Sequence, residues 1–315
     1  MRIVRILNGP ALALVLAMGL SVPATAQTIL APSLSCLGDG NADTQVTVDE
    51  IIGSVNNALQ GCGFVPVTIS FAAAVGDEPF ACGNTYEGVG TGGVSYTPAD
   101  LRFYVHNVRL IDEAGREVPI VLDQDGIWQD DDLVLLDFED KSPPCNNGTT
   151  QTNTTIRGMV PAGNYDGIRF ALGVPFRMNH QDVATAESPL VLTSMFWNWQ
   201  GGYKFIRIDD QEDLFRVHVG STGCAPGPTE VDACQRPNRG EAFLLNFDPA
   251  TDTIIADLAA LLADSDLEVN QAETPPGCMA GPSDLDCTNV LANLGVNFAN
   301  GLPDPSRQIF FRVAP

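Results

Sequence analysis

The chain is poor in histidine, in tryptophan and in basic residues. It has only 3 histidines, 3 tryptophans and 16 lysines and arginines, against 39 aspartates and glutamates, which gives a formal net charge of -23. A field of that sign repels nucleic acid and anionic membranes and attracts cations. We therefore expect no nucleic-acid partner, and we interpret the charge first as a source of solubility outside the cell.

Beyond its N-terminus the sequence also lacks an apolar run long enough to cross a bilayer, which takes about 20 residues. The N-terminus itself combines Arg2 and Arg5 with an apolar stretch at 11–22 and the small-residue pattern Ala24-Thr25-Ala26. This order is typical of a secretion signal. We predict a signal peptide over residues 1–26 and a periplasmic or secreted mature chain without a membrane span.

No C-x-x-C spacing occurs, which disfavours a thiolate metal site of the zinc-finger kind. The number of cysteines is even, at 8, and all follow the predicted signal peptide, so an oxidising compartment would favour disulfides. Spacing alone does not fix the connectivity. It favours the pairs Cys36–Cys62, Cys224–Cys234 and Cys278–Cys287, which leaves Cys82–Cys145.

Residues 27–63 carry a pattern of oxygen-bearing side chains at the spacing of an EF-hand calcium loop, followed by apolar residues at helical spacing. The segment resembles a dockerin-like half EF-hand. The sixth loop position is Thr44 instead of glycine, which lowers the expected calcium affinity. The alternative is an acidic turn closed by Cys36 and Cys62. The candidate calcium ligands are Asp39, Asn41, Asp43, Gln45 and Glu50.

From residue 64 to 315, short runs rich in Val, Ile, Phe and Tyr alternate with Gly, Pro, Asn and Asp. This pattern predicts a mainly β domain, sandwich-like, with two short helices near 254–262 and 290–294. The expected strands cover residues 65–75, 100–110, 117–122, 133–138, 154–160, 165–172, 190–199, 203–208, 214–219, 242–247 and 308–313.

One of these strands changes its apolar parity. Leu101, Phe103 and Val105 share a face, whereas Val108 and Leu110 have the opposite parity. The switch predicts a β-bulge near His106. A bulge can re-aim a side chain, so His106 is a candidate metal ligand, although a hydrogen-bonded strand histidine is the simpler interpretation.

The run from Met195 to Phe205 contains two tryptophans, and His180 and His218 flank it. In an extended strand Trp197 and Trp199 would share one face with Met195. The pair is either a core anchor or part of a metal or redox site. Neutral imidazoles bind copper or zinc, and so sparse a ligand set fits copper better than tetrahedral zinc.

The sequence also lacks the G-x-S-x-G elbow and any patterned carboxylate pair, so we do not expect an enzyme. Several motifs, however, resemble the MbnP family of exported copper-binding proteins, in the same order along the chain. The similarity begins near residue 64 and does not include the calcium-loop unit. The motifs lie at residues 100–110, 135–139, 173–180, 195–205, 218–224 and 234–239.

The resemblance implies a particular chemistry. A partner di-haem peroxidase of the MauG or MbnH type would oxidise a tryptophan to kynurenine, whose aromatic amine would bind one copper ion together with His180 and His218. Trp199 is the favoured target, Trp197 the close alternative and Trp128 a third. An unmodified indole nitrogen has no free lone pair and is a poor ligand. The competing hypothesis is a calcium-stabilised module that holds a protein or a glycan without copper.

Overall fold

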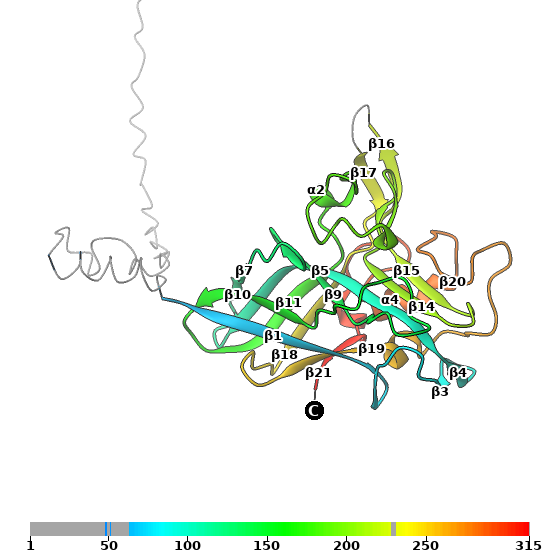
Figure 1. Cartoon of the computed structure of the whole chain (residues 1–315), viewed down its shortest axis with the longest axis horizontal. Coiled ribbons are helices and arrows are strands. Elements are labelled where there is room, and N and C mark those ends of the chain that lie inside the picture. The colour runs from blue at the N-terminus through cyan, green and yellow to red at the C-terminus, as the bar shows by residue number, and fades with distance from the viewer. Residues whose placement is uncertain (1–47, 49–50, 52–62, 228–230, 315) are drawn as a thin grey trace, which may run out of the picture. The chain divides into compact units, whose positions relative to one another are not determined.

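The computed structural model describes residues 48, 51, 63–227 and 231–314 (Figure 1). Nearly all of them belong to the second of two units into which the chain divides, Gly63–Pro315. The predicted signal peptide, the candidate calcium ligands and the Cys36–Cys62 pair lie outside the described residues. None of the described helices has the length and apolar character that a membrane span requires.

A six-stranded sheet forms one layer of this unit, as the alternating pattern predicted. Its central strand β1 pairs antiparallel with β10 and parallel with β19, so the two ends of the unit's sequence meet in one sheet. Its strands are β1 (Phe64–Val75), β2 (Glu78–Pro79), β7 (Val121–Leu122), β10 (Thr155–Pro161), β19 (Thr253–Asp257) and β21 (Phe311–Val313).

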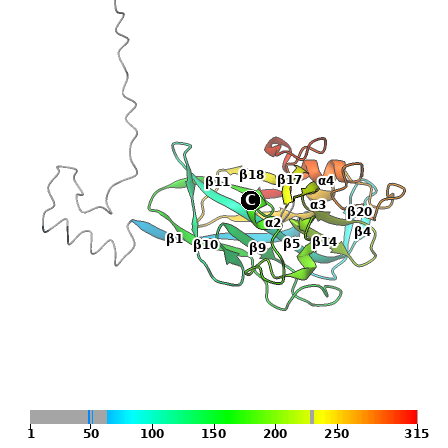
Figure 2. The ribbon, with the colours of Figure 1, turned by 90° about the horizontal axis from the view of Figure 1, so that it is seen from above.

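A nine-stranded sheet forms the second layer and is built around one long strand, β5, which pairs with β6, β9, β11 and β14. Figure 2 shows the same layers from above. The strands of this sheet are β5 (Pro98–Asp112), β6 (Glu117–Pro119), β8 (Gln129–Asp130), β9 (Leu133–Asp137), β11 (Tyr165–Leu172), β14 (Ile206–Asp210), β15 (Arg216–Val219), β18 (Gly240–Leu245) and β20 (Gly277–Cys278).

Three separate hairpins complete the strand set: β3 (Tyr86–Val89) with β4 (Val94–Tyr96), β12 (Phe196–Asn198) with β13 (Gly202–Tyr203), and β16 (Thr222–Pro226) with β17 (Val231–Arg236). The described helices are short: α2 (Phe176–Asn179), α3 (Leu258–Leu262) and α4 (Cys287–Asn293), with 3-10 turns at Thr193–Met195 and Pro305–Arg307. The mainly β, sandwich-like prediction is confirmed.

The main core lies between the two large sheets. Phe71 of β1 packs edge-on against Phe103 of β5 and Phe170 of β11, with ring centroids 6.3 and 5.8 Å apart. Phe311 of β21 lies 4.9 Å from Phe170. Such pairs add about 0.5–1.5 kcal/mol beyond the area they bury, so these rings fix how the sheets face each other.

The predicted bulge in β5 is present. Asn107 has a φ of 53°, and the pairing of β5 with β11 shifts register beside it. Val105 and Val108 consequently both face the main core despite their odd spacing. The bulge leaves His106 at the turning point of the strand.

One helix boundary differs from the prediction. The apolar stripe that begins at Ile254 is not one helix, because Ile254 belongs to β19 and α3 begins only at Leu258. Asp257 separates the two elements, since its side chain accepts hydrogen bonds from the backbone N–H groups of Ala259 and Ala260. Such an N-cap fixes a helix start whatever the apolar spacing before it.

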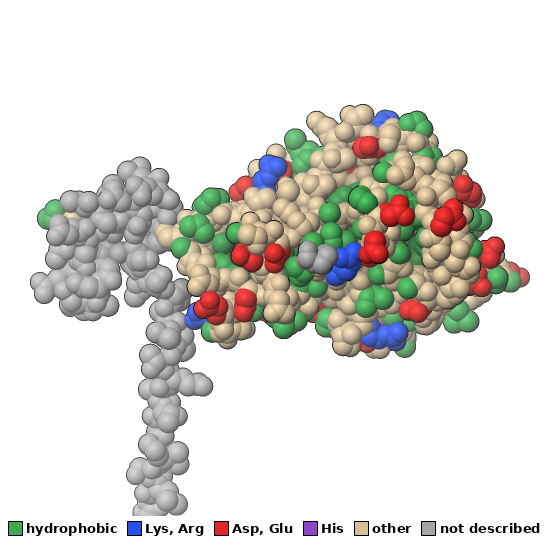
Figure 3. Space-filling view, turned by 90° about the horizontal axis from the view of Figure 1, so that it is seen from below, with side chains coloured by type: hydrophobic (Ala, Val, Ile, Leu, Met, Phe, Trp, Pro, Cys, Tyr) green, Lys and Arg blue, Asp and Glu red, His purple; other side chains and the backbone are tan. Residues whose placement is uncertain are grey.

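Three disulfides lie within the described residues, at Cys82–Cys145, Cys224–Cys234 and Cys278–Cys287. They confirm the two pairs that spacing favoured in this part of the chain and the remaining pair, Cys82–Cys145. The face of the molecule in Figure 3 carries separate acidic side chains with a few basic ones among them. On that face the negative charge is dispersed, which fits a general solubilising role better than a single cation site.

Candidate metal centre

A second, smaller apolar cluster lies on the outer face of the nine-stranded sheet, beneath the segment from residue 174 to 205. Tyr104 and Leu135 supply its floor, and Met178, Met195 and Tyr203 cover them. The two methionines, which stand next to the candidate ligands in sequence, are therefore buried as packing residues. This cluster holds the segment that carries His180 and both candidate tryptophans.

The prediction of one strand over residues 190–199 is wrong. Residues 193–195 form a 3-10 turn, and only Phe196–Asn198 is extended, as β12. The chain then turns back at once, because the Asn198 side chain accepts a hydrogen bond from the Gly201 N–H at 2.8 Å. The Asn-Trp-Gln-Gly sequence is thus a hairpin turn, and asparagine followed by glycines was the available signal.

As a consequence, Met195, Trp197 and Trp199 do not share a face. Met195 is buried in the smaller cluster, whereas Trp197 packs at the edge of the main core. Trp199 lies in the turn and is 40% exposed. The Trp197 ring rests on the backbone of Gly220, where an added Cβ would stand 2.6 Å from ring atom Cζ3. The two indoles therefore have different environments.

His180 follows α2 and faces the turn between β12 and β13. Its Nδ1 lies 3.2 Å from the carbonyl oxygen of Trp199, and its Nε2 lies 3.2 Å from the Asn179 amide nitrogen. These partners favour the tautomer in which Nδ1–H donates to the carbonyl and Nε2 keeps its lone pair. Burial lowers the pKa of His180, and nearby Arg239 lowers it further. The imidazole is thus held neutral.

His218 lies on β15, and its side chain points away from the apolar face that Phe215, Val217 and Val219 form. Its Nε2 lies 2.6 Å from Oδ1 of Asp209 on β14. Burial lowers the pKa of His218 although the Asp209 carboxylate opposes that shift. Burial alone would raise the pKa of Asp209, but His218 and Arg207 outweigh it and bring that pKa well below its usual range. The hydrogen bond to Asp209 thus fixes Nε2 and leaves Nδ1 for another partner.

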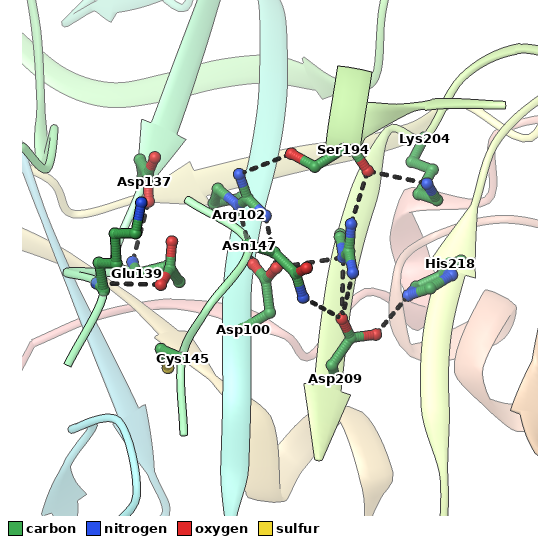
Figure 4. A network of polar contacts seen from close by, with 12 residues as sticks. Asp100, Arg102, Asp137, Glu139, Cys145, Asn147, Ser194, Lys204, Asp209 and His218 are labelled. Atoms are coloured by element: carbon green, nitrogen blue, oxygen red, sulfur yellow. Dashed lines mark hydrogen bonds and ion pairs between the residues drawn. The ribbon is translucent and has the colours of Figure 1, made fainter. Parts of the chain in front are cut away.

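A buried polar network surrounds His218 (Figure 4). Arg102 pairs with Asp100 at 2.5 Å, and Arg207 reaches both Asp100 at 3.1 Å and Asp209 at 2.6 Å. The pairing of β5 with β14 places Arg207 opposite Arg102 and Asp209 opposite Asp100, so unlike charges meet within each strand and along the diagonal. Fully paired charges can be buried; a single one would be costly.

This network of buried charges is not among the features predicted from the sequence. The available signal was a repeated pattern of charged, apolar and charged residues, at 100–102 and again in reverse order at 207–209. Alternate residues of a strand share a face, so each pattern places an acid and a base side by side. The interpretation of the charge as a source of solubility is wrong for Asp100 and Asp209, which are buried.

Lys204 acts on both the Trp197 ring and His218 through its positive charge. Its ammonium lies 6.0 Å from the centre of the Trp197 ring, and its charge lowers the pKa of His218. Burial lowers the pKa of Lys204 itself to about 8. Figure 4 shows Lys204 and His218 together at one end of the network. Lys204 is thus a common neighbour of Trp197 and His218. Trp199, in contrast, contacts His180 through its backbone carbonyl.

The hydrogen bond of His106 involves neither of the candidate tryptophans and neither of the other two histidines. Its Nδ1 is 2.9 Å from the carbonyl oxygen of Gly173, as expected for a hydrogen-bonded strand histidine. Burial lowers the pKa of His106 to about 4. Trp128, the third candidate tryptophan, packs against the smaller apolar cluster.

A pocket of about 540 Å³ opens beside Trp197, between the β12–β13 turn and the start of β16. Gln200 lines it and donates a hydrogen bond of 2.7 Å to the Cys224 carbonyl, which ties the turn to the β16–β17 hairpin. Among the described residues, one group of three His, Cys, Asp or Glu has its ligand atoms mutually within 4.8 Å: His180, Cys224 and Cys234. His218 is not part of that group.

The candidate centre lies in a part of the chain that is similar to known proteins. The sequence profile of the MbnP family matches residues 65–280, which is more than half of the chain. The chain belongs to the MbnP family. A solved structure, MbnP from Methylosinus trichosporium, matches with a TM-score of 0.70 and 30% sequence identity, over 80% of this chain and 98% of that one. No curated protein matches the chain.

The MbnP match includes every described residue of the candidate centre, from His106 to Cys234, because all of them lie between residues 65 and 280. MbnP proteins are accessory proteins rather than enzymes, so membership agrees with the expectation that this chain is not an enzyme. Its disulfides fit a periplasmic or extracellular protein. The match leaves the copper, the oxidised tryptophan and the haem partner as proposals.

Proposed function

We propose that this MbnP-family chain is an exported protein that binds one copper ion, and that a partner di-haem peroxidase completes the site by oxidising a tryptophan to kynurenine. His180 and His218 would supply imidazole nitrogens, and the aromatic amine of kynurenine a third ligand. The single observation that carries the proposal is the state of the two histidines: each has one ring nitrogen held by an oxygen acceptor and a lone pair on the other. At His180 the metal would replace the Asn179 amide, which lies 3.2 Å from Nε2.

That arrangement is what metal-binding histidines usually have. The second ring nitrogen normally donates to a carboxylate or a carbonyl, which fixes the tautomer and the orientation of the ring. Asp209 does this for His218 and the Trp199 carbonyl for His180. Burial keeps both imidazoles in the neutral form that metals need. The donor set of this chain therefore fits a sparse copper site.

Access favours Trp199 as the oxidised residue, because 40% of it is exposed to a docking partner. Trp197, half-buried on Gly220, is the alternative. Oxidation breaks the indole C2–C3 bond and adds two oxygens, with peroxide as the electron acceptor. Hydrolysis then releases the ring carbon as formate and leaves the amine. Copper bound there would be cargo or a stored ion, and the residues of this chain position it.

Intact mass and peptide mapping test the proposal directly. Chain produced together with a di-haem partner should show a net gain of one oxygen and loss of one carbon, because formate carries away the carbon and one of the two added oxygens, and the change should map to Trp199. It should persist in Trp197→Phe and vanish in Trp199→Phe. The reverse result would assign Trp197.

Copper analysis of the same material forms the second arm. His180→Gln and His218→Gln should each lose copper, with His106→Gln as the matched control. An unmodified mass, with copper unchanged in both variants, would overturn the proposal. If such material held calcium alone, the interaction-module hypothesis would replace it.

A further inference from the structure

The Cys224–Cys234 disulfide lies directly against His180. Cys234 Sγ is 3.4 Å from Nε2 of that histidine, the nitrogen that keeps its lone pair. All three potential ligand atoms lie mutually within 4.8 Å. The other two described disulfides take no part in any such group among the described residues. The contact therefore distinguishes this disulfide from the rest.

The hairpin that carries the disulfide does not depend on it for its shape. Cys224 of β16 and Cys234 of β17 are paired residues of an antiparallel ladder, and the ladder extends on both sides, from Thr222 opposite Arg236 to Pro226 opposite Val231. The two Cα atoms are 3.8 Å apart. If the sulfur–sulfur bond were reduced, backbone pairing would keep both thiols beside each other and beside His180.

The surroundings also favour thiolates. Arg239 is half-buried, and among the described residues its Nη2 is buried without a hydrogen-bond partner. Its Nε donates to the Val174 carbonyl, and its guanidinium lies 5.0 Å from the centre of the Phe205 ring. Its charge acts on His180. Positive charge that reaches His180 also favours a thiolate on Cys234, whose Sγ lies 3.4 Å from that ring, and the thiolate is the form of cysteine that binds metals.

We propose that reduction of Cys224–Cys234 creates a second metal site, in which the two cysteine sulfurs and His180 Nε2 bind a soft ion, Cu(I). A dithiol reductant supplies two electrons and two protons. The sulfur–sulfur bond breaks, the dithiol becomes a disulfide, and the protons end on the two cysteines until the ion displaces them. Thiolate ligands select Cu(I), which accepts three donors.

The site shares only His180 with the copper centre proposed above. It requires neither His218 nor an oxidised tryptophan, so it goes beyond the proposed function. One imidazole would then serve two ligand sets, according to the redox state of the hairpin. His180 cannot bind two ions through one nitrogen, so the thiol state would draw copper away from the kynurenine site.

The test uses the full chain made without a haem partner, so that both tryptophans stay intact. The protein is reduced with a dithiol, freed of it without oxygen and titrated with Cu(I) against a chromogenic Cu(I) chelator. The reduced protein should bind one equivalent more than the oxidised protein. Peptide mapping with a thiol-alkylating reagent should find Cys224 and Cys234 among the reduced residues.

Three variants decide the outcome. Cys224→Ser with Cys234→Ser should abolish the additional equivalent. His180→Gln should weaken it by more than the roughly 10–100-fold that loss of an outer-sphere partner causes. His218→Gln should leave it unchanged, although it abolishes the site of the proposed function. No additional copper in the reduced chain, or additional copper that survives the double serine variant, would overturn the inference. Copper binding equal to wild type in His180→Gln would do so as well.

Discussion

The two histidines of the proposed copper site are held by different kinds of structure. His218 stands on a regular strand of the nine-stranded sheet, and a buried carboxylate within a network of paired charges fixes its ring. His180 stands at the end of a single helical turn, and a neutral carbonyl, a side-chain amide and a disulfide surround it. Charge holds the first ring, whereas turns and a covalent bond hold the second.

The site therefore combines one histidine whose ring is firmly held with one whose ring can move at lower cost. Moving His218 would break a hydrogen bond to the buried Asp209 carboxylate, and hydrogen bonds to charged groups contribute about 1.5–3 kcal/mol. Moving His180 would require only the loss of weak hydrogen bonds at a turn, about 1 kcal/mol each. If the proposed function holds, the adjustable half would let the site accept both an ion and a docking enzyme. Breaking each half separately tests this comparison.

The largest effect is expected on the charged half. Arg102→Met removes the guanidinium that pairs with Asp100 and donates to Ser194 Oγ, leaving a buried carboxylate short of a partner. Breaking a buried pair in this way typically costs about 3–5 kcal/mol. Denaturant unfolding should show that loss. Arg169→Met, which removes half-exposed pairs with Glu117 and Glu241, should cost only about 0–1 kcal/mol. Equal losses would contradict the distinction.

The next effect is a dependence of stability on pH. Burial raises the pKa of Asp137 in the folded state to about 7, whereas an unfolded Asp has about 3.9. Below pH 4 both states are protonated. Between pH 4 and 7 only the unfolded state releases its proton, so stability falls as pH rises, by up to about 4 kcal/mol.

Asp137→Asn stays neutral and should lack that fall. Its free energy of unfolding should therefore gain on that of wild type as pH rises from 4 to 7, in denaturant titrations at several pH values. Parallel pH profiles for the two proteins would show that Asp137 ionises normally in the fold.

A smaller effect concerns copper directly. Asp209→Asn removes the carboxylate that orients His218, and loss of such an outer partner typically weakens metal binding by about 10–100-fold. Competition titration of the matured protein would measure it. Asn147→Ala, which removes only a 3.3 Å contact to the other oxygen of Asp209, is the matched control. If both variants bind copper alike, the carboxylate has no orienting role.

The smallest effect is expected at His106. His106→Gln removes the contact between Nδ1 and the Gly173 carbonyl but no proposed ligand, so copper stoichiometry should not change. A loss as large as that of His218→Gln would make His106 a ligand and would shift the centre toward the bulge in β5.

The sequence predicted the regular half of the molecule well. Strand 165–172 was predicted to the residue, and the bulge near His106 followed from parity alone. Both succeed because one face of each strand is buried, so alternation records which side chains face inward.

The irregular half was predicted poorly, for a physical reason. The aromatic and methionine content of residues 190–199 favours a strand, but a 3-10 turn and the Asn198 side chain ended the extended backbone. Apolar residues there fill the smaller cluster from a coiled path, so burial leaves no period of two in the sequence. The contact of His180 with the hairpin disulfide depends on long-range packing that local patterns do not encode.

The close packing of the Trp197 ring on Gly220 limits which residue can occupy position 220. At Gly220 an added methyl group would meet the ring on one side and the Tyr203 carbonyl oxygen, also at 2.6 Å, on the other. Neither neighbour is a flexible side-chain end, so room for alanine could come only from moving the strand. Homologues that keep this indole should keep glycine opposite it. Genomes alone can be surveyed for that joint occurrence, before any protein is purified.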